Sequence, residues 1–293
     1  MGNGTYSRSC FEIYSRMSGK NYDATTNRVV GQKYTVSEMD PKLNPSRVIR
    51  ECRNSDEHPN TIPVILALDV TGSMGNACKE TAEALGNIME ELYNKYKDVQ
   101  IMVMGIGDLA YDDAPIQISQ FESDVRIAEW LDKIYMEHGG GGNNYESYTA
   151  AWYMGLHHTK LDAYDKQNRK GIIITMGDEP LNPYLPAYEL REATGDSVQA
   201  DIDTNELFKD ATEKFDIYHI AVDDNGDSYS RYKHSIENTF GKLLGQRYMV
   251  STISNLGRTI CDCVENSVSS SNNCSQSVLN EGETNIGNEG ISW

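Results

Sequence analysis

The chain has 293 residues, which is enough for one large domain with extensions or for two small domains. Acidic residues outnumber basic ones by 44 to 26, and the formal net charge is −18. This balance argues against a nucleic-acid partner, because proteins that bind phosphate backbones usually carry a basic face or stripe. No apolar run reaches the roughly 18–20 residues of a membrane span, and the N-terminus lacks the apolar core of a signal peptide. We therefore expect a soluble, cytoplasmic protein without membrane contact.

The first 60 residues differ from the rest in charge and in pattern. They hold 9 Lys and Arg against 7 Asp and Glu, which leaves 17 against 37 for the remainder of the chain. Because they show little apolar periodicity, we expect residues 1–60 to form an extension that wraps the core with short strands or loops. The six cysteines include no CxxC pair and are expected to be reduced thiols.

Beyond the extension, predicted strands alternate with predicted helices. Continuous apolar runs predict four strands covered on both faces, at 61–70, 99–107, 171–175 and 215–222. Apolar side chains at three- and four-residue spacing predict helices at 76–96, 125–135, 148–156, 204–214, 232–244 and 253–268, with a short helix near 187–193. Asp203, with Glu206 three residues later, is the expected cap of the helix before the last strand.

This alternation predicts an α/β fold with a doubly wound, mostly parallel sheet and helices on both faces. We place the domain at 61–265, with one short antiparallel edge strand near 115–121. Residues 266–293 are rich in Ser, Asn and Gly, and we expect them to form a flexible tail.

The first predicted strand ends on a carboxylate. Its apolar run stops at Asp69, and hydroxyl side chains follow at alternate positions, Thr71 and Ser73. One interpretation is that Asp69 caps the following helix. Two other loops expected at the same edge of the sheet, 139–147 and 176–180, also combine glycines with oxygen-bearing side chains. Oxygen ligands without His or Cys favour a hard cation such as magnesium, calcium or manganese.

The sequence Asp69-x-Thr71-x-Ser73 resembles the DxSxS motif of von Willebrand factor type A domains, in which three loops build a metal-ion-dependent adhesion site. The resemblance covers roughly residues 61–265. It implies that Thr71 and Ser73 ligate the cation through their hydroxyls, and that Asp69 binds through water and orients the loop. Magnesium is the favoured cation, with calcium and manganese as alternatives.

The other two loops resemble a subset of that family. Many members carry a threonine after paired glycines, where this chain has Asn143. The subset reads GGGDxPE and GDAP, which residues 140–146 and 177–180 resemble, with Asn for Asp and Tyr for Pro in the first loop. The resemblance implies that Asp178 and one of Asn143 and Glu146 complete the metal site, and it leaves open which of these two touches the cation.

Tyrosine is abundant, with 18 residues against 5 Phe. Four tyrosines, Tyr145, Tyr148, Tyr184 and Tyr188, lie in or after the predicted metal loops. Because tyrosine buries area yet tolerates water, these side chains are expected either to contact a partner or to pack within the protein.

Two functions fit a carboxylate and a divalent cation at the end of a strand. The first is a protein-binding module whose cation is completed by an acidic residue of a partner protein, and the resemblance suggests an intracellular multiprotein assembly. The second is a phosphoryl-transfer enzyme of the haloacid-dehalogenase type, which needs a carboxylate two residues after its nucleophilic Asp. Thr71 occupies that place, and the GK[ST] ending of a phosphate loop is missing. The sequence therefore favours the binding module over an enzyme.

Overall fold

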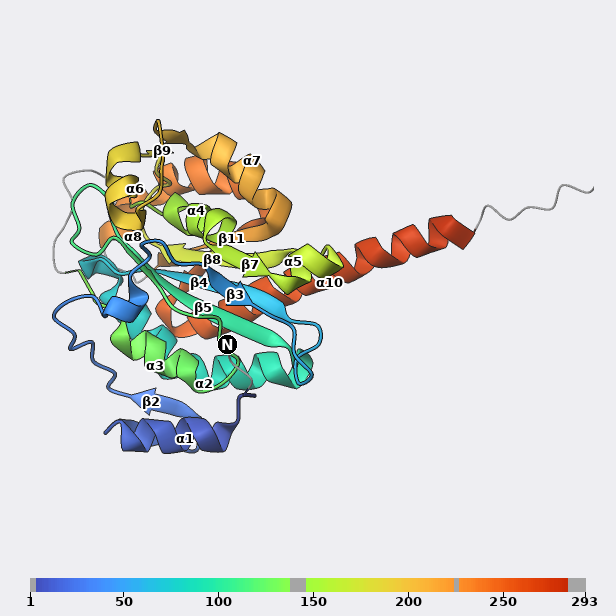
Figure 1. Cartoon of the computed structure of the whole chain (residues 1–293). Helices are drawn as coiled ribbons and strands as arrows, with labels where there is room; N and C mark the ends of the chain where they lie inside the picture. Colours follow the sequence, from blue (N-terminus) through green and yellow to red (C-terminus); the bar gives the residue numbers. More distant parts are fainter. Residues whose placement is uncertain (1–3, 138–145, 224–226, 284–293) are drawn as a thin grey trace, which may run out of the picture.

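The computed structural model describes residues 4–137, 146–223 and 227–283 (Figure 1). Its centre is a six-stranded sheet in the order β12-β11-β8-β4-β5-β6. Neighbouring strands are parallel except for β5 and β6, which are antiparallel. The predicted α/β fold is thus confirmed, together with its antiparallel edge strand. The bounds are β4 (Ile62–Asp69), β5 (Val99–Ile106), β6 (Ile116–Ile118), β8 (Gly171–Gly177), β11 (Phe215–Asp223) and β12 (Tyr248–Thr252).

Helices cover both faces of this sheet (Figure 1). One face packs against α2 (Gly75–Lys95), α3 (Arg126–Lys133) and α10 (Leu256–Glu283), and the other against α4 (Thr149–His157), α7 (Thr204–Lys214) and α8 (Asp227–Ile236). Alternate side chains of β4 enter the two apolar cores, because successive residues of a strand point to opposite faces. Every residue of β4 after Ile62 is therefore buried, which explains its unbroken apolar run.

Shorter elements lie in the connections between these helices and strands. They are α5 (Asp162–Gln167), β9 (Tyr184–Leu185), α6 (Ala187–Thr194), β10 (Ile202–Asp203) and α9 (Lys242–Leu244). Asp203 accepts hydrogen bonds from the backbone N–H groups of Asn205 and Glu206, at 2.8 and 3.2 Å, so the predicted cap is confirmed. The helix predicted at 232–244 differs, because a π-helical turn at Glu237–Gly241 separates α8 from α9.

The N-terminal extension contains a helix that the sequence pattern did not predict. This helix, α1 (Arg8–Met17), is capped by Ser7, whose Oγ accepts a hydrogen bond from Cys10 N at 3.2 Å. Phe11 is buried beside Gly86 of α2 and belongs to the same apolar core as the sheet. The expected short strands are present as β1 (Asn21–Asp23), β2 (Arg28–Val30) and β3 (Arg50–Cys52), and β3 pairs in parallel with β7 (Thr159–Leu161).

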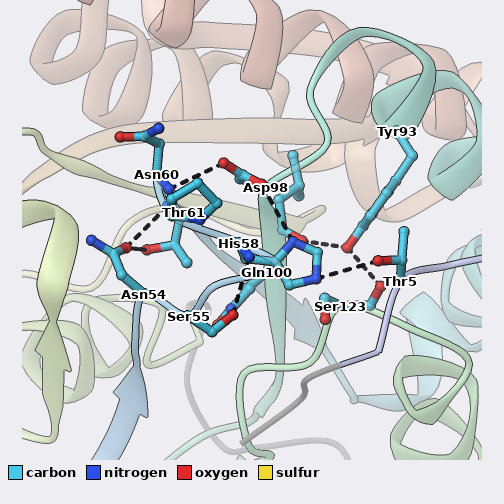
Figure 2. Close-up of polar contacts among 12 residues, drawn as sticks. Thr5, Asn54, Ser55, His58, Asn60, Thr61, Tyr93, Asp98, Gln100 and Ser123 are labelled. Atoms are coloured by element: carbon cyan, nitrogen blue, oxygen red, sulfur yellow. Dashed lines mark hydrogen bonds and ion pairs between the residues drawn. The ribbon is translucent and has the colours of Figure 1, made fainter.

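A buried histidine fastens the beginning of the extension to the rest of the protein (Figure 2). The Nδ1 atom of His58 lies 3.3 Å from Asp98 Oδ1, at the start of β5. Its Nε2 atom lies 3.1 Å from the carbonyl oxygen of Gly4 and 3.5 Å from Thr5 Oγ1. Asp98 also accepts a hydrogen bond from Asn60 N at 3.1 Å, so one carboxylate holds both the histidine ring and the loop that carries it.

The C-terminal part of the chain differs from the prediction in two ways. The edge strand β12 was not predicted. Where we expected a flexible tail from residue 266, α10 remains helical to Glu283, and its end projects beyond the body of the molecule in Figure 1. Within the described ranges, no helix has both the length and the apolar composition needed to cross a bilayer. Free thiols are present at Cys10, Cys52, Cys78, Cys261 and Cys263.

Candidate metal centre

Asp69 lies at the carboxyl end of β4, in the middle of the sheet. Leu68 pairs in register with Met176 of β8, so Asp69 and Gly177 stand at the same level of two neighbouring strands. The chain then makes a 3-10 turn at Gly72–Met74 and enters α2. Neither this turn nor α2 has a side-chain cap, so the interpretation of Asp69 as a helix cap is wrong.

Both carboxylate oxygens of Asp69 are held by hydrogen bonds. Its Oδ1 accepts from the backbone N of Thr71 at 2.9 Å and from Thr71 Oγ1 at 2.5 Å. Its Oδ2 accepts from the hydroxyl of Tyr148 at 2.7 Å. The Asp69 side chain is 0% exposed, which makes this a fully buried carboxylate with a fixed orientation.

Ser73 connects the first loop to the third. Its Oγ donates to Asp178 Oδ1 at 3.1 Å, directly after the end of β8. Asp178 is buried, whereas Ser73 is exposed. The structure therefore brings together four of the predicted site residues, Asp69, Thr71, Ser73 and Asp178, with the serine on the solvent side.

The second loop contributes Glu146 to the same region. Glu146 forms a bridge with Leu181 of the third loop, is 5% exposed, and leaves its Oε2 buried without a hydrogen-bond partner. The other candidate from this loop, Asn143, lies outside the described residues.

The carboxylates of this region repel one another. Burial raises the pKa of Asp69, and the nearby charge of Asp178 raises it further, against the hydrogen bonds from Thr71 and Tyr148. Burial also raises the pKa of Glu146, and Asp69 and Glu179 add to the effect. A bound cation favours the ionised form of nearby carboxylates. Several buried carboxylates thus lie close together at one place in the fold.

These side chains fit a hard divalent cation. In the described part of the chain, no three His, Cys, Asp or Glu side chains by themselves form a group that could hold a metal ion. A cation at this edge would therefore need the hydroxyls of Thr71 and Ser73, which is the mixed donor set that the sequence predicted. The unpartnered, buried oxygen of Glu146 is a group that such a cation would satisfy.

The structure adds residues that the sequence reading did not place in the site. Tyr148, which the sequence predicted either to pack or to contact a partner, is buried and donates a hydrogen bond to Asp69. Asp108 follows β5 at the same edge of the sheet and has a buried Oδ2 without a partner. The loop of Asp108 is tied to the second loop, because Leu109 N donates to Ser147 Oγ at 3.0 Å. The rule that parallel strands end at one edge could have found Asp108, but nothing in the sequence pairs Tyr148 with Asp69.

Comparison with known proteins gives matches in structure only. No protein-family profile and no curated protein matches the sequence. The pilus adhesin SpaC from Lactobacillus rhamnosus GG, in its open conformation, is similar with a TM-score of 0.49 and 12% identity, over 73% of this chain and 31% of that chain. The vWF domain of the type V pili tip protein Mfa5 from Porphyromonas gingivalis is similar with a TM-score of 0.43 and 10% identity, over 79% of this chain and 98% of that chain.

This chain thus spans about a third of the length of SpaC, and nearly all of the Mfa5 domain. Because both TM-scores lie below 0.5, the α/β fold rests on the strand order and the helix layers of this chain. The matches carry no conclusion about a cation or a partner.

Proposed function

We propose that this chain is a von Willebrand factor type A domain that binds a partner protein through a divalent cation. The observation that supports this most strongly is the meeting of three loops at the carboxyl ends of β4 and β8. Within the first loop, Thr71 donates a hydrogen bond to Asp69. Ser73 of the same loop donates a hydrogen bond to Asp178 of the third loop. The second loop adds the buried, unpartnered oxygen of Glu146.

Thr71 and Ser73 would hold the cation through their hydroxyls. Asp69 and Asp178 would bind it directly or through water, and one of Asn143 and Glu146 would add an oxygen. Magnesium is favoured, with calcium and manganese as alternatives. When bound, the cation supplies a Lewis acid that attracts an anionic oxygen of the partner. The chain's own side chains fix the position and the orientation of this centre.

The partner in this proposal presents an acidic residue to the cation. Residues 61–293 carry 37 Asp and Glu against 17 Lys and Arg, so an acidic ligand is repelled at long range and gains only at close contact with the metal. Tyr184 and Tyr188 follow the third loop and are 43% and 63% exposed, which suits a protein interface. We place this recognition in an intracellular multiprotein assembly, without a nucleic acid or a membrane.

We propose no catalytic step for this centre. The side chain two residues after Asp69 is the Thr71 hydroxyl, which donates a hydrogen bond to that carboxylate. A haloacid-dehalogenase mechanism needs a second carboxylate there as acid and base. Hydrolysis of an aryl phosphate with magnesium, lost in Asp69→Asn, would replace this proposal with the enzymatic one.

The test is calorimetric titration of the full chain with magnesium, compared with the Thr71→Ala/Ser73→Ala variant. We expect one binding event in the wild type and none in the variant, because the variant removes the two hydroxyl ligands. A thermal melt of both proteins without metal controls for the fold. Unchanged magnesium affinity in a folded double variant would refute the assignment.

A further inference from the structure

We propose that Tyr148 is the positioning residue that fixes the Asp69 carboxylate for magnesium. This inference rests on the proposed metal function and concerns a residue outside the predicted ligand set. Tyr148 is the first residue before α4 and is 1% exposed. Its hydroxyl donates to Asp69 Oδ2 at 2.7 Å, while Thr71 holds the other oxygen, Oδ1. With both oxygens bonded, the carboxylate cannot rotate about its last torsion without losing a hydrogen bond.

The tyrosine side chain touches the third loop as well as the first. The backbone N of Glu179 donates to the Tyr148 hydroxyl at 3.4 Å. A Cβ atom added to Gly177 would overlap the same hydroxyl and the ring carbon that bears it, so only glycine leaves room for the phenol. One side chain at the start of α4 thus contacts both the residue that ends β4 and the loop that follows β8.

Two buried aromatic side chains pack against the ring of Tyr148. It makes edge contacts with His219, with ring centroids 5.4 Å apart, and with Phe240, with centroids 5.6 Å apart. His219 lies on β11, and Phe240 on the π-helical turn after α8. Because the ring cannot move freely, its hydroxyl presents a fixed donor to Asp69.

A fixed carboxylate matters more for magnesium than for calcium. Magnesium demands a nearly ideal octahedron with short bonds, whereas calcium accepts irregular sets of six to eight oxygens. Groups that orient a metal-binding side chain typically change metal affinity by about 10–100-fold. Loss of the Tyr148 hydroxyl should therefore weaken magnesium binding and lower the preference for magnesium over calcium.

The experiment measures magnesium and calcium affinities of Tyr148→Phe by calorimetry. This variant keeps the ring and removes only the hydroxyl. Tyr153→Phe is the matched control, because Tyr153 lies on the same helix and its hydroxyl donates to a different carboxylate, Asp196, at 2.6 Å. We expect magnesium affinity to fall about 10–100-fold in Tyr148→Phe, calcium affinity to fall less, and Tyr153→Phe to match the wild type. Unchanged affinities, or an equal loss for both cations, would overturn the positioning role.

A second measurement without metal separates this inference from the proposed function. A double-mutant cycle combines Tyr148→Phe with Asp69→Ala and compares the free energies of unfolding in denaturant. The two changes should be non-additive, whereas Tyr153→Phe with Asp69→Ala should be additive. If the wild type binds neither cation, the proposed function fails, and the cycle still decides whether Tyr148 holds Asp69. Additivity of the Tyr148 cycle would overturn the inference.

Discussion

Three carboxylates of the candidate site, those of Asp69, Glu146 and Asp178, are almost completely buried. Burial of an ionised group is costly unless a partner compensates for the lost water. Hydrogen bonds compensate Asp69 on both oxygens, but one oxygen of Glu146 has no partner. At the scale of single residues, the proposed divalent cation would remove the repulsion and satisfy this oxygen.

Part of this arrangement could be read from the sequence. Asp69, Thr71 and Ser73 alternate at the end of an apolar run, which is a local pattern in the sequence. They are close in the structure because they are close in the chain. The contact of Tyr148 with Asp69 joins residues 79 positions apart. It depends on the packing of α4 against the sheet, which no local pattern records.

A pH-dependent prediction concerns His219, which is buried behind the site. Its ring stacks on Phe240 with centroids 3.5 Å apart, Nδ1 lies 2.9 Å from Thr175 Oγ1, and Nε2 has no partner. Burial lowers the pKa of His219 from 6.5 to about 3. Between these values the unfolded chain binds a proton that the folded chain does not, so stability is retained above pH 6.5 and falls as the pH falls.

The measurement compares the wild type with His219→Phe by denaturant unfolding at pH 7.5 and pH 5. The wild type should lose about 2 kcal/mol more than the variant over this interval, because only the wild type carries the histidine. Carboxylate contributions are present in both proteins and cancel in the difference. Parallel pH dependence of the two proteins would show that His219 titrates equally in the folded and unfolded states.

At the scale of elements, the sequence predicted best those segments whose whole length is buried. The strands β4, β5, β8 and β11 have continuous apolar runs because helices cover both of their faces. The edge strand β12 was missed because only Ser251 among its residues is buried, so its sequence carries little apolar signal. Helix α1 was missed for a similar reason, since it buries only Phe11 and Ser15.

Helix α1 nevertheless packs on the main core, so we expect it to unfold together with the rest of the protein. Phe11 is 1% exposed and reaches the main core beside Gly86, whereas Ile13 on the same helix is 57% exposed. Phe11→Ala should lower the free energy of unfolding by about 3–5 kcal/mol, as deletion of a buried aromatic side chain does. Ile13→Ala is the control and should stay within about 0.5 kcal/mol of the wild type.

Urea unfolding monitored by circular dichroism gives both values. If Phe11→Ala were no more destabilised than Ile13→Ala, the extension would not be part of the unit that unfolds cooperatively.

At the scale of the whole molecule, the fold gathers the site from loops that are far apart in the sequence. Asp69, Glu146 and Asp178 follow or precede different elements, and they meet because parallel strands end at one edge of the sheet. The extension is fastened at the opposite ends of the strands, where His58 contacts Asp98 at the start of β5 (Figure 2). The anchor at His58 therefore lies at the opposite ends of the strands from the candidate metal centre, where Ser73 is exposed.

The most direct test of the central claim is the position of a bound cation. In crystals of the full chain grown with manganese, an anomalous difference map should show one peak beside Thr71 Oγ1 and Ser73 Oγ. The ligand distances should be about 2.0–2.6 Å, with Asp69 and Asp178 in the same oxygen cluster. Manganese bound elsewhere on the acidic surface, with no peak at these two hydroxyls, would contradict the assignment of a metal centre to this edge of the sheet.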